Sequence, residues 1–303
     1  MRSTVDTVVA TIDLGGTNLR AASVAVTGDS CRVLDVVRVR TSDFVADQNV
    51  AASLKAVLNF ICEYAESSRA RFGTEALAAA FPGPVQAPGT VLAMPTIWGA
   101  GGQVLCPFDL RGELAARLPG MRIDVMNDVS AACYRFAGEG DDFALFTLGT
   151  GIGLKVFIAG RPYVGPHGYG GELTHMVFDR SPEAPLCDCG GQGHLGALSS
   201  GRAWQRELAV SRASGREPDL IRFVEPLARS VAMLHFSLGL ERFVFAGGLA
   251  EGLGESLREA IVRNLPAQGW DAGQDWDAMI ELAPSDDSHA LIGGALAVAR
   301  GCQ

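Results

Sequence analysis

The chain has 303 residues, 48% of them hydrophobic, enough to bury the core of one large domain or two moderate ones. Its formal net charge of -9 argues against nucleic acid or an anionic membrane as the main partner. The sequence shows neither a secretory signal pattern nor the roughly 18 apolar residues that span a bilayer. We therefore expect a cytoplasmic protein whose seven cysteines are free thiols or metal ligands.

The first part of the chain predicts an antiparallel meander followed by alternating helices and strands. Three Val-rich segments predict strands over 8–14, 19–26 and 32–40, the first turn being formed by Gly15 and Gly16. Apolar residues at helical spacing predict a helix over 47–72. The pattern then predicts a strand over 76–81, a helix over 108–118, a strand over 122–128 and a helix over 129–137.

The second part of the chain repeats this order in outline. Strands are expected over 143–149 and 153–165, then a glycine-rich region to about residue 201, long helices, a strand over 242–248 and a final helix over 289–300. The repeat predicts an α/β protein of two related halves around a central cleft. We place a smaller first domain at 1–126, joined by the C-terminal helix 289–303, and a larger one at 127–288.

Glycine-rich turns follow three of the predicted strands. Asp13 ends the first strand, and the turn after it lacks bulky side chains, so backbone N–H groups could approach a polyphosphate while the acid faces its metal ion. Each turn alone is equally typical of an ordinary hairpin. Together they favour a nucleotide site made by Asp13, Gly15, Gly16, Thr17, Asn18, Thr150, Gly151, Gly247 and Gly248.

Asn127 and Asp128 follow a predicted strand and begin a helix. Asp is common at a helix N-cap, so a capping role for Asp128 is one interpretation. The other is a general base, because phosphoryl transfer to an alcohol needs a carboxylate beside the attacking hydroxyl.

Four nitrogen and sulfur side chains lie within 20 residues of one another: His175, Cys187, Cys189 and His194. Structural zinc prefers four such ligands in a tetrahedron. Two free thiols and two surface histidines are the alternative, and the glycines around the cysteines favour a loop wrapped around an ion.

These motifs, in their order along the chain, resemble the ROK family of sugar kinases and repressors. The matching segments are DLGGTNLR, FPGPV, NDVSAA, LGTGIG, GYGGELTH, CDCGGQGH, SSG and FAGG. The resemblance implies two actin/hexokinase-like (ribonuclease H-like) domains, an ATP-dependent kinase that uses Mg²⁺, a structural Zn²⁺ and a homodimer. It also implies that Asp128 is the base and that Gly83, Asn127, Asp128, Glu172 and His175 contact the acceptor, with His175 also binding zinc.

The chain departs from the family's pattern at three positions. His194 stands where the last cysteine of the zinc motif is usual, and zinc accepts either. Gly196 stands where the family places a glutamate that binds sugar hydroxyls, which favours a non-standard acceptor. Lys155 stands where a small residue is usual.

We therefore expect a kinase that phosphorylates glucose or an aminohexose such as kanosamine or glucosamine. In a hexose, the hydroxyl that receives the phosphate is expected to be the one on C6. A C7-cyclitol is the alternative acceptor, and compounds of both kinds occur in antibiotic biosynthesis. Three rival functions remain. The first is a sugar-responsive repressor, which is disfavoured because such proteins carry a DNA-binding domain before the core and here the core begins by Val8. The second is a non-enzymatic sugar-binding regulator. The third is an acetate-kinase-like enzyme, which is disfavoured because such enzymes have no counterpart of the zinc residues.

Overall fold

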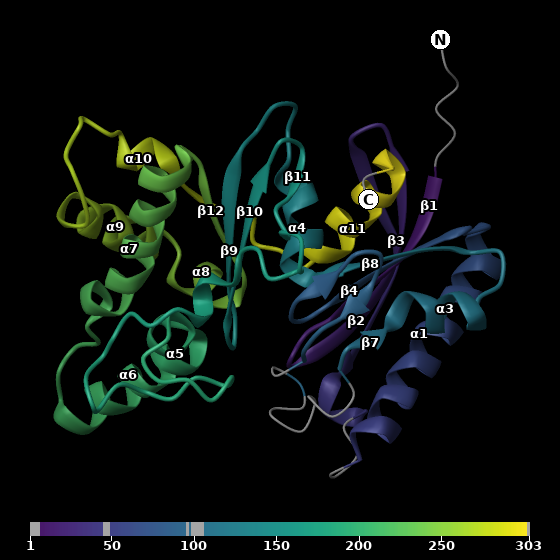
Figure 1. The fold of residues 1–303 in the computed structure, drawn as a ribbon, viewed down its shortest axis with the longest axis horizontal. Helices are drawn as coiled ribbons and strands as arrows, with labels where there is room; N and C mark the ends of the chain where they lie inside the picture. Colours follow the sequence, from purple (N-terminus) through teal and green to yellow (C-terminus); the bar gives the residue numbers. More distant parts are fainter. Residues whose placement is uncertain (1–6, 45–48, 95–96, 98–105, 302–303) are drawn as a thin grey trace. The chain divides into compact units, whose positions relative to one another are not determined.

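The computed structural model describes residues 7–44, 49–94, 97 and 106–301. Its contacts divide the chain into two compact units, each containing a five-stranded sheet (Figure 1). The first unit comprises Met1–Gly138, Val164–Gly170 and Ser288–Gln303. The second comprises Glu139–Tyr163 and Gly171–Asp287.

The sheet of the first unit has the strand order β3-β2-β1-β4-β8. As the Val-rich segments predict, β1, β2 and β3 form an antiparallel meander, while β4 and β8 run parallel to β1. The carboxyl ends of β1, β4 and β8 therefore meet at one edge of the sheet. The strands are β1 (Thr7–Leu14), β2 (Asn18–Thr27), β3 (Ser30–Arg40), β4 (Ala76–Phe81) and β8 (Arg122–Asn127).

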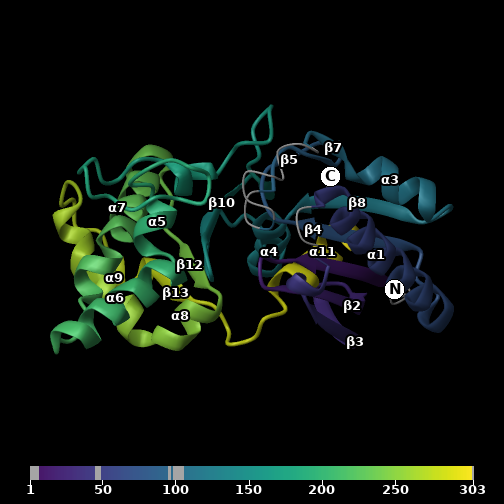
Figure 2. The same cartoon turned by 90° about the horizontal axis from the view of Figure 1, so that it is seen from below.

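Helices cover both faces of this sheet (Figures 1 and 2). Helix α1 (Val50–Phe72) and helix α3 (Leu110–Arg117) share a hydrophobic core with alternate residues of β1, β4 and β8. The expected start of α1 at residue 47 lies outside the described residues, and Asn49 caps the helix that is seen. Helix α11 (His289–Arg300) packs against β1, β2 and β4 and against helix α4 (Asp128–Phe136).

The contact between α11 and α4 is close because α11 contributes a glycine. A Cβ atom on Gly293 would lie 2.0 Å from the carbonyl oxygen of Ala131, so no larger residue fits at this approach. This packing assigns α4 to the first unit, and the division falls after Gly138 instead of after residue 126.

A small antiparallel sheet follows β4. It consists of β5 (Val85–Gln86), β6 (Thr90–Val91) and β7 (Phe108–Asp109), strands too short for residue alternation to predict them. Gly83 makes the turn into this sheet with φ +92°, and a Cβ there would lie 2.2 Å from the carbonyl oxygen of Ala93. Only glycine fits that turn.

The sheet of the second unit has the order β11-β10-β9-β12-β13, with β9, β12 and β13 parallel and β10 antiparallel to β9. Helix α7 (Leu220–Leu238) and helix α9 (Glu255–Asn264) bury their apolar faces on it. The strands are β9 (Phe143–Leu148), β10 (Ile152–Ile158), β11 (Arg161–Pro162), β12 (Phe243–Ala246) and β13 (Ile280–Leu282). The remaining elements are η1 (Thr41–Asp43), η3 (Glu172–His175), α5 (Leu195–Ser199), α6 (Gly201–Ser214), α8 (Gly248–Leu253), η4 (Leu265–Ala267) and α10 (Trp276–Met279). Within the described ranges, no helix has the length and apolar character to cross a membrane.

Candidate active site

The sheet edge of the first unit gathers seven of the predicted site residues. Asp13 lies beside Ala80 in the β1–β4 register, and Asn127 lies beside Phe81 in the β4–β8 register. The Gly15–Thr17 turn, Gly83 and Asp128 immediately follow these strand ends. Parallel strands thus place the phosphate-type hairpin and the candidate base on the same edge.

The Gly15–Thr17 hairpin is held from behind by Thr41, a buried residue that the sequence reasoning missed. The Thr41 hydroxyl donates to the carbonyl of Gly15 at 2.7 Å, and its backbone N–H donates to the carbonyl of Thr17 at 3.0 Å. These two contacts fix the hairpin's carbonyls, while Gly16 and Thr17 remain exposed at the tip. Thr41 lies 26 residues from Gly15, so no local pattern reveals it.

Asp13 is buried and forms an ion pair with Arg20, its partner across the β1–β2 ladder. Burial raises the pKa of the Asp13 carboxyl, and the Arg20 guanidinium opposes that rise through its charge and a hydrogen bond. Arg20 therefore helps to keep Asp13 ionised, the form that a cation would need.

The side chain of Asn127 organises the start of helix α4. Its Oδ1 accepts the backbone N–H of Ser130 at 3.0 Å, and its Nδ2 donates to the carbonyl of Gly83 at 3.0 Å. The same Nδ2 donates to Oδ1 of Asp128 at 2.9 Å, and that oxygen also accepts the Val129 backbone N–H at 2.9 Å. Asn127 is thus the N-cap, and Asp128 is the half-buried first residue of the helix. Its carboxylate is oriented by two donors.

Three glycine-rich segments converge at the end of β9 in the second unit. The carbonyl of Gly149 accepts the backbone N–H of Gly201, at the start of α6, at 2.9 Å. A Cβ on Gly201 would lie 2.4 Å from that same oxygen, and a Cβ on Gly247 would lie 2.7 Å from the carbonyl oxygen of Leu148. These close contacts hold together the Thr150–Gly151 turn, the start of α6 and the end of β12. Thr150 is exposed.

Glu172 and His175 occupy the short helix η3, next to β10. Oε1 of Glu172 lies 3.6 Å from Nζ of Lys155, a buried residue of β10, and Oε2 lies 4.0 Å from Nε2 of His175. Lys155, the lysine that is unusual for the family, therefore contacts Glu172, and Glu172 in turn lies near His175; both are predicted acceptor contacts.

The four predicted zinc ligands come together within the second unit. One ligand atom from each of the four side chains lies within 4.8 Å of the other three. Nδ1 of His175 is 3.7 Å from Sγ of Cys187, and Nδ1 of His194 is 3.2 Å from Sγ of Cys189. A tetrahedron with Zn–S near 2.3 Å and Zn–N near 2.0 Å has edges of about 3.3–3.8 Å, close to these two N···S distances. Two sulfur and two nitrogen donors are also a set that zinc accepts.

The loop that carries these ligands is shaped by its own backbone. Cys187 donates its N–H to the carbonyl of Gly191 at 2.8 Å, and the carbonyl of Gly193 accepts the N–H of Phe178 at 2.8 Å. A Cβ on Gly193 would lie 1.7 Å from the carbonyl oxygen of Asp179, so the glycine is required. Burial, followed by the electrostatic effect of His175, lowers the pKa of His194, which favours the neutral form of the imidazole that binds metals.

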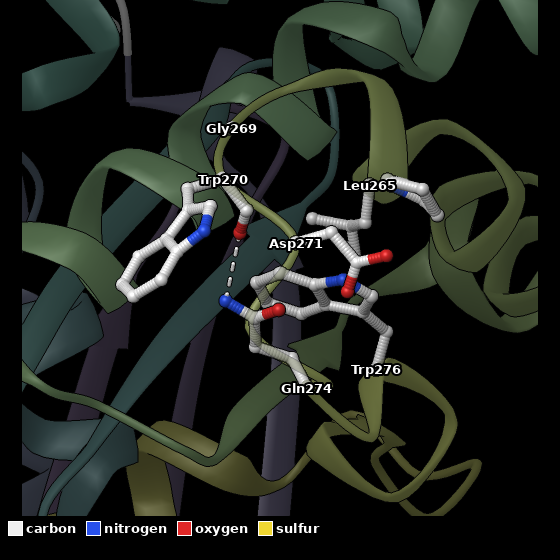
Figure 3. Close-up of a pocket in the computed structure, with 7 residues that line it drawn as sticks. Leu265, Gly269, Trp270, Asp271, Gln274 and Trp276 are labelled. Atoms are coloured by element: carbon white, nitrogen blue, oxygen red, sulfur yellow. Dashed lines mark hydrogen bonds between the residues drawn. The ribbon is translucent and has the colours of Figure 1, made fainter.

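A pocket of about 180 Å³ lies elsewhere in the second unit, around η4 and the start of α10 (Figure 3). Trp270 and Trp276 line it, and Nε2 of Gln274 donates to the carbonyl of Trp270 at 3.0 Å. None of the predicted site residues lines this pocket, and we assign it no part in the candidate site.

A model of the ROK family matches residues 9–301. The chain belongs to the ROK family. This ROK protein is 34% identical to the C(7)-cyclitol 7-kinase of Streptomyces hygroscopicus subsp. jinggangensis, an alignment that covers 97% of the chain and 94% of the relative. It is 30% identical to the N-acetylmannosamine kinase of Escherichia fergusonii, over 80% of the chain and 84% of the relative. The ROK hexokinase of Thermus thermophilus has a similar structure, with a TM-score of 0.71, 27% identity, and coverage of 96% of this chain and 97% of that one.

The match confirms the family resemblance and the mixed α/β fold that the motifs predict. The structure gathers the predicted site residues of the first unit at one sheet edge. In the second unit they form two sets, one at the end of β9 and one at η3 with the Cys/His cluster. The sequence reasoning missed two supporting contacts, Thr41 behind the first hairpin and Gly201 behind the second. The SSG motif, Ser199 to Gly201, was a signal for the latter.

Proposed function

We propose that this ROK chain transfers the γ-phosphate of ATP to a hydroxyl of a C7-cyclitol. The observation that carries the acceptor class is the 34% identity to a C(7)-cyclitol 7-kinase over 97% of the chain. Gly196 supports it, because a site without a carboxylate at this position lacks one acceptor for the hydroxyls of an ordinary hexose. Glucose, glucosamine and kanosamine are the alternative acceptors for this reaction and should be tested beside the cyclitol.

In the proposed reaction Asp128 is the general base. Its carboxylate would take the proton of the acceptor hydroxyl as that oxygen attacks the γ-phosphorus, and ADP leaves. Asn127 holds one oxygen of the carboxylate at 2.9 Å, which limits its rotation before the acceptor arrives. Glu172 and His175 would accept or donate hydrogen bonds to the remaining hydroxyls, and Gly83 would leave room for the ring.

Backbone N–H groups at the two hairpin turns would hold the phosphates. Gly15, Gly16, Thr17 and Asn18 form the first, Thr150 and Gly151 the second, and Gly247 and Gly248 lie beside the second. Asp13 would face Mg²⁺, which supplies positive charge to the phosphate oxygens. Positioning and electrostatics would give most of the acceleration.

A zinc ion on His175, Cys187, Cys189 and His194 would have a structural role. Nδ1 of His175 belongs to the cluster, while Nε2 faces Glu172. Holding the ring by one nitrogen fixes the direction of the other, which is how a metal outside the reaction orients an acceptor contact. We also propose a homodimer, which light scattering would test, and a role in antibiotic biosynthesis.

The deciding experiment is a coupled assay of ADP release over C7-cyclitols, glucose, N-acetylmannosamine, glucosamine and kanosamine, with mass analysis of the product. We expect the cyclitol to give the highest kcat/KM. A clear preference for glucose would contradict the cyclitol proposal. ADP release that no acceptor stimulates would contradict the kinase function altogether.

A further inference from the structure

Lys155 is a buried cation in the middle of strand β10, with 1% of its surface exposed. The chain has 25 Lys and Arg residues, yet only two are lysines, and the other, Lys55, is exposed on α1. An ammonium group loses its hydration on burial and needs a charged or hydrogen-bonding partner in return. Within its own unit, Lys155 contacts the carboxylate of Glu172.

The contact between Lys155 and Glu172 is set by the backbone as well as by charge. Nζ lies 3.6 Å from Oε1 of Glu172, and Gly171, the residue just before η3, has φ +89°. A Cβ on Gly171 would lie 3.1 Å from Cδ and 3.2 Å from Nζ of Lys155, so a glycine here lets η3 lie close over the lysine. The carboxylate is therefore held against the ammonium before any acceptor binds.

We infer that Lys155 is a positioning residue that selects an uncharged polyol as the acceptor over an aminosugar. The inference rests on the proposed function, in which Glu172 contacts the acceptor. Lys155 engages Oε1, and Oε2 points toward His175, so the orientation of the carboxylate is fixed from both sides.

The charge of Lys155 gives this arrangement its selectivity. A carboxylate beside a buried ammonium still accepts hydrogen bonds from hydroxyl groups, but the pair carries no net charge. An acceptor ammonium next to Glu172 would meet the positive charge of Lys155, and because Lys155 is buried, solvent would screen the repulsion weakly. A neutral cyclitol or hexose meets no such repulsion.

A matched pair of acceptors tests the selectivity. Glucose and glucosamine differ only at C2, and at about pH 6.5 the amine is protonated, below the range of about 7.7–8.0 for an α-amino group. In Lys155→Met we expect kcat/KM for glucosamine, divided by that for glucose, to rise at least about tenfold, mainly through KM. Lys55→Met is the matched control and should leave the ratio unchanged.

The two possible failures differ. ADP release that no acceptor stimulates, in the unaltered enzyme, would contradict the proposed function. Turnover of both acceptors with the same preference in Lys155→Met would contradict the role of Lys155 alone.

A spectroscopic measurement on the unaltered protein covers the case in which Lys155→Met does not fold. Lysine labelled with ¹⁵N at Nζ gives two side-chain signals, and Lys55→Met assigns them. We expect slow proton exchange for Lys155 and a shift of its signal when glucose saturates the enzyme, with no shift for Lys55. An unshifted Lys155 signal at saturation would contradict the inference.

Discussion

The side chain of Asn127, and not that of Asp128, caps helix α4. Oδ1 of Asn127 accepts the Ser130 N–H at 3.0 Å, while its Nδ2 holds Oδ1 of Asp128 at 2.9 Å. The capping interaction and the carboxylate therefore belong to different residues. Substitutions of Asn127 and of Asp128 can therefore test the helix cap and the proposed general base separately.

Asp128→Asn should abolish phosphoryl transfer and leave the fold intact, because the cap of α4 is unchanged. We expect kcat to fall about a hundredfold or more, the usual contribution of a general base, with ATP affinity near normal. ADP-release kinetics and ATP titration measure the two quantities. More than about a tenth of the original kcat would exclude Asp128 as the base.

Asn127→Ala should have the opposite effect, destabilising the fold through the loss of the helix cap. Loss of the N-cap should lower the free energy of unfolding by about 1 kcal/mol, as is typical when Asn at this position is replaced by Ala. Asp128→Asn should not show that loss in the same denaturant titration. Equal destabilisation by both substitutions would mean that Asp128 shares the cap.

Thr41→Val should weaken ATP binding more than acceptor binding. The substitution keeps the shape of the side chain but removes the 2.7 Å hydrogen bond to the Gly15 carbonyl, so the Gly15–Thr17 hairpin loses one of its two ties to Thr41. We expect KM for ATP to rise severalfold, about 1 kcal/mol of binding. Ser42→Ala, at the exposed neighbour, is the control and should change neither KM.

Removing the metal should affect the acceptor more than the nucleotide. We expect about one zinc per chain by elemental analysis, and loss of that zinc in Cys187→Ser. Because His175 bridges the cluster and Glu172, KM for the acceptor should rise by about 10- to 100-fold while KM for ATP changes little. Full zinc content in Cys187→Ser would show that the cluster is not the binding site.

Gly196→Glu tests whether the missing carboxylate shapes the choice of acceptor. A Cβ at this position would meet the carbonyl oxygen of Thr174 at 3.5 Å and Sγ of Cys187 at 3.9 Å, ordinary contact distances, so a side chain can be accommodated. We expect kcat/KM for glucose to rise relative to the cyclitol by about tenfold, the effect of about 1.4 kcal/mol. Gly196→Ala, which adds bulk without charge, should not reproduce the change.

The sequence predicted most of the regular elements and the ligand cluster because both depend on local patterns. The Val-rich meander and the helix at 289–300 follow from residue periodicity, and the four proposed zinc ligands lie close in sequence. The contacts of Thr41 and Gly201 could not be predicted in this way, since each depends on how distant segments pack. The sequence showed that Lys155 is unusual at its position but did not predict its contact with Glu172, because that contact depends on how η3 packs against β10.

The support of helix α4 has a consequence for how the protein is made. Gly293 of α11 lies against Ala131 of α4, and α11 follows every other described element of the first unit in chain order. A chain emerging from the ribosome presents α4 long before the helix that packs on it exists. We therefore expect α4, and with it Asp128, to reach its final packing only after α11 has been synthesised, so that a shorter nascent chain should have no transferase activity.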